Sequence, residues 1–238
     1  MENFKVVVVI PTYNEKTNLP VLIGKIFNLN IPGLEVLVVD DNSPDGTADV
    51  VREMAQKYPV QVMVRDQKRG LGTAYAAAFK LLLNQSDKPD YIIQMDADLS
   101  HDPKVILLML NKIKECDVVL GSRYIKGGGV RNWNFLRRLV SRLSNIYARL
   151  ILGISVRDLT GGFKCWRREV LEKIDLEGLD SVGYNFQIET TYKALRAGFK
   201  ICEAPIVFTE RKSGSSKFNF GIIWESFIKV FLLRFRGH

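Results

Sequence analysis

Apolar and polar positions along the first half of the chain follow two alternating patterns. Short runs rich in Val and Ile predict buried strands at residues 6–10, 35–39, 60–64, 91–95 and 117–120. Between them, apolar residues recur every three or four positions, which predicts amphipathic helices at residues 17–29, 47–58, 71–83 and 103–114. Strands that are apolar on both faces and alternate with helices are typical of a parallel sheet covered by helices. We therefore expect an α/β fold.

The second half is less regular but carries one strong helical pattern. Between residues 133 and 152, apolar residues at three- and four-residue spacing predict an amphipathic helix that also carries four arginines. The apolar positions are Leu136, Leu139, Leu143, Ile146 and Leu150, and the arginines are Arg137, Arg138, Arg142 and Arg149. Three glycines at residues 127–129 predict a flexible loop, and residues 158–163 predict a turn. Residues 200–208 predict a strand, and residues 211–217 predict a basic loop.

The last segment, residues 218–238, is strongly apolar with charged residues interspersed. It is too short and too charged to span a bilayer, and no run of about 20 apolar residues occurs elsewhere, so we expect no transmembrane helix. The pattern favours an interfacial helix whose aromatic residues enter the membrane while its basic residues meet lipid head groups. The alternative is a helix that docks on the protein core or on a membrane-embedded partner subunit.

Composition narrows the classes of partner. A chain of 238 residues with 47% hydrophobic residues suffices for one large domain with a substantial core. Its formal net charge of +8 suits phosphorylated ligands, an anionic membrane surface or nucleic acid. No recognised nucleic-acid motif occurs, so we expect no nucleic-acid partner. The number and spacing of Cys116, Cys165 and Cys202 argue against a disulfide framework or a zinc site, and favour reduced, mostly buried thiols in a cytosolic protein.

Polar clusters follow three of the predicted strands, at residues 12–15, 40–43 and 96–98. Ligands of parallel α/β sheets bind beyond the carboxyl ends of the strands. These clusters are far apart in the sequence, and we expect them to converge in space. Residues 69–74 contain two glycines at a predicted helix start, which favours close approach of the backbone to a ligand there.

The last of these clusters contains two aspartates, Asp96 and Asp98. In an extended segment alternate side chains share a face, so both carboxylates would point the same way with Ala97 opposite. Two like charges this close raise one pKa unless a cation lies between them. Mg²⁺ or Mn²⁺ resolves that conflict through carboxylate and phosphate oxygens, so we favour a metal site over a solvated turn.

The other two clusters suit a nucleotide. A carboxylate of Asp40 or Asp41, at the tip of the second strand, can accept hydrogen bonds from a base or ribose. Tyr13 and Glu15 are available for a nucleobase stack and a ribose hydroxyl. The alternative for the aspartate pair is that one of them caps a turn.

Taken in order, seven motifs resemble those of the polyprenol (dolichol) phosphate mannose synthases, which are inverting glycosyltransferases of family 2 with a GT-A fold. The motifs are PTYNE at 11–15, VVDDNSPDGT at 38–47, GLGTAY at 70–75, MDADLSHDP at 95–103, GSRY at 121–124, DLTGGF at 158–163 and ERKSGSSK at 210–217. The resemblance covers nearly the whole chain. It implies a single GT-A, Rossmann-like domain over residues 1–238, with a nucleotide-sugar half (1–122), an acceptor half (123–217) and an amphipathic membrane-proximal or docking helix (218–238).

The resemblance also implies roles for individual residues, matched motif by motif. The nucleotide-sugar contacts are Pro11, Tyr13, Glu15 and Asp41, with Asp40 as a near neighbour, and Asp96 and Asp98 bind the metal and the diphosphate. The acceptor phosphate is held by Arg123, Arg137 and Ser141, and a mobile loop that closes over the donor carries Arg211 and Lys217. The catalytic groups are Asp98, Arg123 and Arg137. Some relatives have a Gln as a further metal ligand at the position of Ser100, which His101 follows.

The implied reaction transfers mannose from GDP-mannose to a polyprenyl or dolichyl phosphate, with Mg²⁺ or Mn²⁺, at the cytoplasmic face of a membrane. A phosphate monoester has a second pKa near ~6 and arrives ionised, so it needs positioning by arginines more than a general base. A single displacement with inversion follows. The alternatives are a glucosyl transfer from UDP-glucose to the same lipid, or transfer to a sugar acceptor. In the last case Asp158 and Glu189 are candidate bases, although turn capping and a helix-surface ion pair explain them equally well.

Three further residue types have ordinary structural interpretations. His101, close to a helix-opening proline, is expected to be a cap or a solvent-facing residue. Trp166, Trp224 and Cys165 are expected to pack in the protein interior.

Overall fold

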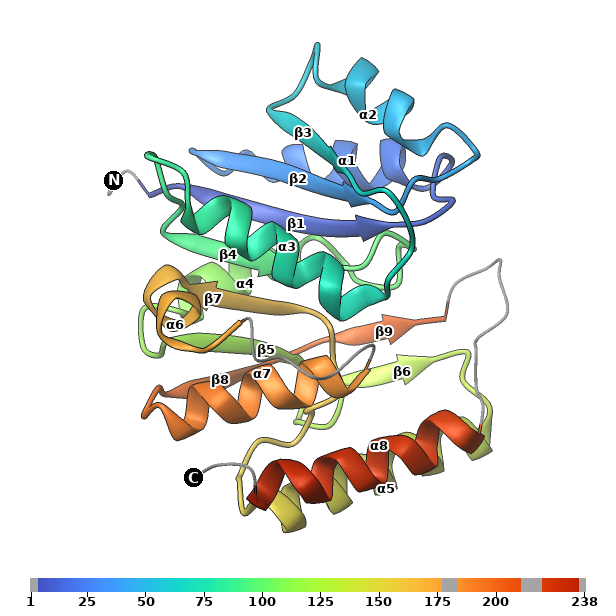
Figure 1. Ribbon diagram of the computed structural model, residues 1–238, viewed down its shortest axis with the longest axis vertical. Coiled ribbons are helices and arrows are strands. Elements are labelled where there is room, and N and C mark those ends of the chain that lie inside the picture. Colours follow the sequence, from blue (N-terminus) through green and yellow to red (C-terminus); the bar gives the residue numbers. More distant parts are fainter. Residues whose placement is uncertain (1–3, 177–183, 211–219, 236–238) are drawn as a thin grey trace.

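A seven-stranded sheet lies between two layers of helices in the computed structural model, which describes residues 4–176, 184–210 and 220–235 (Figure 1). In spatial order the strands are β3 (Val60–Val64), β2 (Leu34–Asp40), β1 (Val6–Thr12), β4 (Tyr91–Gln94), β7 (Lys164–Arg167), β5 (Val118–Ser122) and β8 (Ile201–Pro205). All neighbouring strands are parallel except β7, which runs antiparallel to both β4 and β5. The expected α/β fold with a mostly parallel sheet is confirmed.

The five strands expected from the first half all form. In the central strand β1 the β-branched residues are buried on both faces: Val6, Val8 and Ile10 enter one core, and Val7 and Val9 enter the other. The boundaries differ slightly: β4 ends at Gln94 and not at residue 95. Strand β7 was not expected. It has only four residues, and because it begins with Lys164 and ends with Arg167 it gives no hydrophobic pattern of its own.

The helices cover the two faces of the sheet. The helices are α1 (Leu19–Phe27), α2 (Thr47–Met54), α3 (Leu71–Leu83), α4 (Val105–Lys112), α5 (Phe135–Leu152), α6 (Arg168–Lys173), α7 (Tyr184–Arg196) and α8 (Phe220–Phe235). One core contains residues of α1, α2 and α4, and the other contains residues of α3, α5, α6, α7 and α8. Burial of apolar side chains on both faces is the main stabilising contribution to such a sandwich.

A short two-stranded ribbon lies beside the main sheet. The segment expected as one strand at residues 200–208 divides into β8 and β9 (Val207–Thr209), and β9 pairs with β6 (Gly129–Arg131). The expected glycine loop is therefore in part a strand. A glycine is needed at residue 128 for a local steric reason: a Cβ at this position would lie only 2.5 Å from the carbonyl oxygen of Ser122. Phe208 of β9 contacts His101, which lies after β4, and Arg123, which lies after β5.

The C-terminal helix α8 docks beside α5 (Figure 1). Tyr147 Oη of α5 donates a hydrogen bond to the carbonyl oxygen of Phe227 at 3.0 Å, and the two rings lie 4.4 Å apart. Val230 of α8 is buried in the same core as Ala148. Docking on the protein, the alternative considered for this segment, is therefore confirmed. In the described part of the chain, no helix is both long and apolar enough to cross a membrane.

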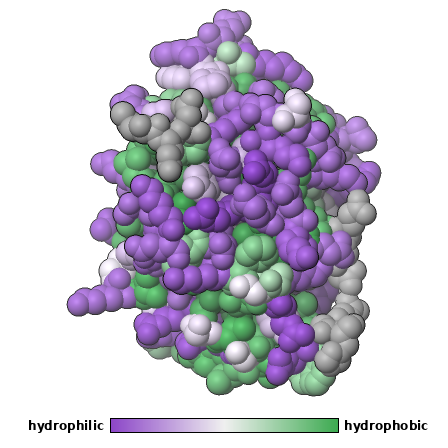
Figure 2. Space-filling view, turned by 90° about the vertical axis from the view of Figure 1, so that its left-hand side faces the viewer, coloured by the Kyte–Doolittle hydropathy of each residue, from purple (hydrophilic) through white to green (hydrophobic). Residues whose placement is uncertain are grey.

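Large apolar side chains nevertheless remain exposed along α5 and α8. They are Phe135, Leu136, Leu139, Leu143, Ile146 and Leu150 on α5, and Ile228, Phe231, Leu232 and Phe235 on α8. Figure 2 shows hydrophobic residues gathered at the lower end of the molecule, which is where Figure 1 places these two helices. Exposed apolar side chains gathered on two neighbouring helices are typical of a protein or membrane contact.

Candidate active site

The polar clusters after β1, β2 and β4 converge at one edge of the sheet, as the sequence predicts. Thr12 lies opposite Asp40 in the β1–β2 register, and Asn14 donates from its backbone N–H to Ser43 Oγ at 2.9 Å. Strand β4 lies directly beside β1, and the N–H of Met95 donates to the carbonyl oxygen of Val9 at 3.1 Å. Three loops that are distant in sequence therefore form one surface.

Asp40 is a structural residue of this surface. It is fully buried, and its carboxylate accepts hydrogen bonds from Thr12 Oγ1 at 2.9 Å and from Ser43 Oγ at 2.6 Å. The backbone N–H of Ser43 supplies a third bond at 2.8 Å. Asp40 therefore fixes the loops after β1 and β2, and its direct contact with a nucleotide stays a prediction.

Asp41 lies closer to the edge of the site and is paired with Arg65. Arg65 Nε donates to Asp41 Oδ1 at 2.6 Å, and Arg65 Nη1 donates to Thr73 Oγ1 at 2.9 Å. Thr73 Oγ1 in turn donates to the carbonyl oxygen of Gly70 at 2.8 Å. The network joins the end of β2 to the start of α3, so the glycine segment expected to approach a ligand is held next to Asp41.

Tyr13 extends the same end of the site. Its ring is 40% exposed, and the ammonium group of Lys68 lies 3.7 Å from the ring centroid. Glu15 accepts a hydrogen bond from Asn18 Nδ2 at 2.7 Å, next to the start of α1. Sequence reasoning missed Arg65 and Lys68, although both follow β3, whose carboxyl end reaches the same edge of the sheet as those of β1 and β2.

Asp96 and Asp98 lie in a bend just after β4, half-buried, with Ala97 buried between them. Asp98 Oδ1 accepts a hydrogen bond from the backbone N–H of Ser100 at 3.1 Å. Among the described residues, no group of three or more His, Cys, Asp or Glu side chains is placed to hold a metal ion. The pair fits Mg²⁺ or Mn²⁺, because such ions use one or two carboxylates and complete their shell with phosphate oxygens and water. Ser100 Oγ is buried without a hydrogen-bond partner in the described structure.

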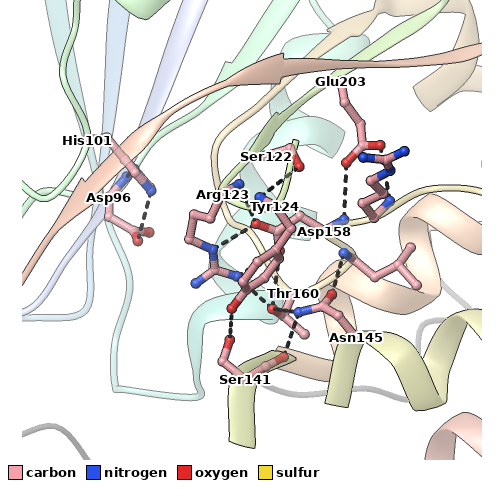
Figure 3. Close-up of polar contacts among 12 residues, drawn as sticks. Asp96, His101, Ser122, Arg123, Tyr124, Ser141, Asn145, Asp158, Thr160 and Glu203 are labelled. Carbon is pink, nitrogen blue, oxygen red and sulfur yellow. Dashed lines mark hydrogen bonds and ion pairs between the residues drawn. The ribbon is translucent and has the colours of Figure 1, made fainter. Parts of the chain in front are cut away.

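His101 is buried beneath this pair, so the expectation of a cap or solvent-facing residue is wrong. Its ring stacks on Phe163 at 4.8 Å and meets the edge of Phe208 at 5.5 Å. Nδ1 accepts a hydrogen bond from the N–H of Asp96 at 3.3 Å, and Nε2 lies 3.9 Å from Asp96 Oδ2 (Figure 3). Burial lowers the pKa of His101, which favours the neutral ring.

A second polar cluster surrounds Arg123, which follows the end of β5 (Figure 3). Arg123 Nε and Nη2 each donate to Asp158 at 2.7 Å, one to each carboxylate oxygen, and Nη2 also donates to Thr160 Oγ1 at 2.7 Å. Asn145 Nδ2 donates to Thr160 Oγ1 at 3.1 Å and to the carbonyl oxygen of Ser141 at 2.9 Å. The guanidinium is thereby held by Asp158 and Thr160, and Asn145 of α5 in turn holds Thr160.

Ser141 and Arg137 join this cluster from α5. Tyr124, which follows Arg123 in the chain, donates a hydrogen bond from Oη to Ser141 Oγ at 2.7 Å. The guanidinium of Arg137 lies 4.2 Å from the Trp133 ring centroid, and that of Arg123 lies 5.4 Å from the same ring. The structure therefore brings together Arg123, Arg137 and Ser141, the three residues matched to the acceptor phosphate.

Trp133 was missed by sequence reasoning, and it organises this part of the site. It is buried and lies directly before α5, one turn from Arg137. Arg137 also forms a short ion pair with Glu210 just after β9. Arg123 and Arg137 lie against one aromatic ring, and each is paired with a carboxylate, Asp158 and Glu210 respectively. Guanidinium groups held in this way offer N–H donors in a geometry suited to an anion.

Phe208 connects the two clusters. Its ring contacts His101 at 5.5 Å and Trp133 at 5.6 Å, and the Arg123 guanidinium lies 5.8 Å from its centroid. Arg123 therefore lies between the aspartate pair after β4 and the arginine of α5.

The remaining candidates fall into three groups. Arg211 and Lys217 lie outside the described residues. Glu189, considered as a base, is buried, with Oε1 3.4 Å from Lys193 Nζ, so the expected ion pair exists but not on the helix surface. Trp166 and Cys165 are fully buried, which confirms their packing role, and burial raises the pKa of the Cys165 thiol. The Trp224 side chain lies outside the described residues.

Comparison with known proteins identifies the family of the chain. The family model described as Glycosyl transferase family 2 matches residues 7–175. The chain is 44% identical over 236 residues to the polyprenol monophosphomannose synthase of Mycolicibacterium smegmatis, covering 98% of this chain and 88% of that protein. It is 40% identical over 227 residues to the undecaprenyl-phosphate mannosyltransferase of Micrococcus luteus, covering 95% and 92% respectively.

Solved structures with the same fold include two transferases. A mannosyltransferase from Pyrobaculum calidifontis in complex with GDP-Man and Mn²⁺ superposes with a TM-score of 0.67 at 19% identity, and the match covers 99% of this chain and 65% of that one. The glucosyl-3-phosphoglycerate synthase of Mycobacterium tuberculosis in complex with Mn²⁺, UDP and glucosyl-3-phosphoglycerate superposes with a TM-score of 0.68 at 18% identity, covering 98% and 80%. At these identities the likeness concerns the fold, and it confirms the expected GT-A architecture.

Proposed function

The chain belongs to glycosyl transferase family 2, and we propose that it transfers mannose from GDP-mannose to a polyprenyl or dolichyl phosphate, releasing GDP. One observation carries the proposal: Arg123 and Arg137 pack on one tryptophan ring, and Arg123 also contacts the aromatic group that covers the aspartate-pair loop. A transferase that joins a phosphate acceptor to a nucleotide sugar needs these two sites side by side.

The donor end of the proposed site uses the edge formed by β1, β2 and β4. Tyr13 offers an exposed ring for the base, and Asp41 offers a carboxylate held in place by Arg65. Pro11 and Glu15 flank this edge. Arg211 and Lys217, which lie outside the described residues, are proposed to neutralise the diphosphate.

Asp96 and Asp98 would hold Mg²⁺ or Mn²⁺ together with the donor diphosphate. The relatives with solved structures carry Mn²⁺ with a nucleotide or nucleotide sugar, which supports a divalent ion here. When bound, the ion neutralises negative charge on the leaving nucleoside diphosphate. His101 supports this loop as a neutral residue, accepting a hydrogen bond from the backbone of Asp96.

The acceptor phosphate is proposed to lie between Arg123 and Arg137, with Ser141 as a further donor. A phosphate monoester is largely dianionic above its second pKa of about 6, so its oxygen is already a nucleophile. Arg123 and Arg137 orient it towards the anomeric carbon, and the displacement inverts the configuration there. Asp158 needs no role as a base, because its two oxygens are taken by Arg123.

The apolar surface of α5 and α8 is proposed to rest on a membrane, where a polyprenyl chain is available. α5 carries Arg137 and Ser141 as well as the exposed leucines, so contact of that helix with lipid would bring the phosphate-binding residues close to the head-group layer. Residues 1–122 would then form the nucleotide-sugar half and residues 123–217 the acceptor half, at the cytoplasmic face. A small membrane-embedded partner subunit is the alternative occupant of this surface.

The test uses radiolabelled GDP-mannose, a short polyprenyl phosphate, and Mn²⁺ or Mg²⁺. We expect metal-dependent label in the lipid phase. The label should be lost in Asp98→Ala. It should persist in the control Asp49→Ala, which alters a surface aspartate of α2. Transfer from UDP-glucose but not from GDP-mannose would change the donor and keep the reaction type. No transfer from either donor by folded protein in the presence of liposomes would overturn the proposed function.

A further inference from the structure

Gln187, in the first turn of α7, has a buried side chain whose polar atoms find no partner. The residue is 1% exposed, and neither Oε1 nor Nε2 makes a hydrogen bond within the described structure. A buried amide without partners is costly, because it has given up its bonds to water without replacing them. Such a group in a native site calls for an explanation, and a ligand that supplies the missing bonds is one.

The amide lies next to the aspartate pair, across the backbone of Gly162. A Cβ at residue 162 would lie 3.5 Å from Asp96 Oδ1 and 3.6 Å from Gln187 Nε2. Any side chain at this position would therefore stand in contact with both groups. The glycine keeps the space between the carboxylate and the amide open.

The backbone that carries Gln187 is anchored by the residues around it. Lys164 Nζ donates to the carbonyl oxygen of Gln187 at 2.7 Å and to Thr191 Oγ1 at 3.0 Å, which ties the first turn of α7 to strand β7. Phe186, the preceding residue, stacks on Tyr75 at 6.0 Å and packs closely over Gly72 of α3. The amide is therefore carried by a helix turn that is bonded to the central sheet and packed on α3, which suits a binding residue.

We propose that Gln187 binds hydroxyl groups of the donor sugar and contributes to the choice of hexose. This inference rests on the proposed function, in which Asp96 and Asp98 hold the donor diphosphate; the sugar is bonded directly to that diphosphate and must lie close to it. A primary amide presents one acceptor and two donor hydrogens side by side, which matches neighbouring hydroxyls of a pyranose. A site built to bond a hydroxyl discriminates strongly against an analogue that places it elsewhere.

The test separates sugar binding from nucleotide binding. Dissociation constants for GDP-mannose and for GDP are measured by calorimetry with Mn²⁺, for the wild type, for Gln187→Met and for Gln187→Asn. The expected result is a loss of about tenfold or more in affinity for GDP-mannose, the scale of one hydrogen bond to a sugar, with the affinity for GDP changed less than twofold. Gln56→Met, the same change at an exposed position after α2, is the matched control and should alter neither constant.

Donor preference gives a second readout. GDP-mannose and GDP-glucose share base and diphosphate and differ in the orientation of one hydroxyl, so the ratio of their kcat/KM values should move towards one in Gln187→Asn. Equal losses for GDP and GDP-mannose, or no loss for either, would overturn the role of Gln187. Failure of the wild type to bind GDP or GDP-mannose would instead overturn the proposed function itself, so the two failures are distinguishable. Retained binding of GDP by each variant shows that it is folded.

Discussion

Arg123 and Asp158 form a two-bond ion pair from which solvent is almost excluded. Arg123 Nε and Nη2 each donate to a different oxygen of Asp158 at 2.7 Å, and the backbone N–H of Arg123 adds a third bond at 2.9 Å. The side chain of Asp158 is fully buried and that of Arg123 is 8% exposed. Asp158 therefore holds the guanidinium of Arg123 in one orientation.

Replacing the carboxylate of Asp158 should weaken acceptor binding more than it slows the chemical step. In Asp158→Asn the charge is lost while the shape is kept, so Arg123 loses its fixed orientation. We expect KM for the polyprenyl phosphate to rise at least tenfold and the dissociation constant for GDP-mannose to stay within twofold. Removing one partner of a buried pair also costs up to about 3–5 kcal/mol of stability. If kcat fell with unchanged KM and a lost acid limb in its pH profile, Asp158 would be a base after all.

Arg137 is expected to contribute through its planar guanidinium. Arg137→Lys keeps the charge but loses the two-pronged donor geometry that suits phosphate, so KM for the acceptor should rise several-fold, and Arg137→Ala should raise it further. Steady-state kinetics with varied acceptor measure the effect. Arg138→Ala, which removes the neighbouring exposed arginine on the same helix, is the control. Equal kinetics for the Arg137 and Arg138 variants would remove Arg137 from the site.

Lys164 should make stability depend on pH in a defined direction. Its ammonium group is fully buried among Thr190, Thr191 and the Gln187 carbonyl, and burial lowers its pKa well below the ordinary value of 10.5. Between that lowered pKa and about 10.4 the unfolded chain binds more protons than the folded one. The free energy of unfolding should therefore rise with pH across this window and decrease as pH falls through it, by at most about 1.4 kcal/mol per pH unit.

Urea unfolding at several pH values between neutral and alkaline conditions tests this. Lys164→Met should remove the slope that Lys164 contributes. Lys88→Met replaces an exposed lysine that pairs with Glu172, and it should leave the slope as in the wild type. A slope that persists in Lys164→Met would show that another group carries the proton linkage.

The exposed leucines of α5 should govern binding to lipid. The double variant Leu143→Gln, Leu150→Gln removes apolar area from the outward face at little cost to folding, because both side chains are more than half exposed. Burial of a leucine side chain contributes about 1.5–3 kcal/mol, so flotation with anionic liposomes should fall at least tenfold.

The matched control for the lipid surface is Leu107→Gln, Leu108→Gln. It makes the same change at two exposed leucines of α4, a helix that packs into the other core. Equal flotation of the two double variants would favour a protein partner as the occupant of the α5–α8 surface.

The sequence by itself determined the elements whose signal is local. The five strands of the first half and the helix at α5 follow from hydrophobic periodicity, because burial on a sheet face or a helix face imposes a fixed spacing along the chain. It also determined that the polar clusters after β1, β2 and β4 would meet, since parallel strands end at a common edge. The seven motifs, in their order along the chain, were sufficient to identify the family.

Only the tertiary structure decided which polar groups are exposed and which are buried. Asp40 and Asp41 are adjacent, yet Thr12 and Ser43 bond to Asp40 in the interior while Arg65 holds Asp41 at the edge of the site. The insertion of β7 and the unpartnered amide on α7 have no local signal. The environment of a side chain depends on segments far away in the sequence, and the long-range packing that brings them together leaves no periodicity in any one of them.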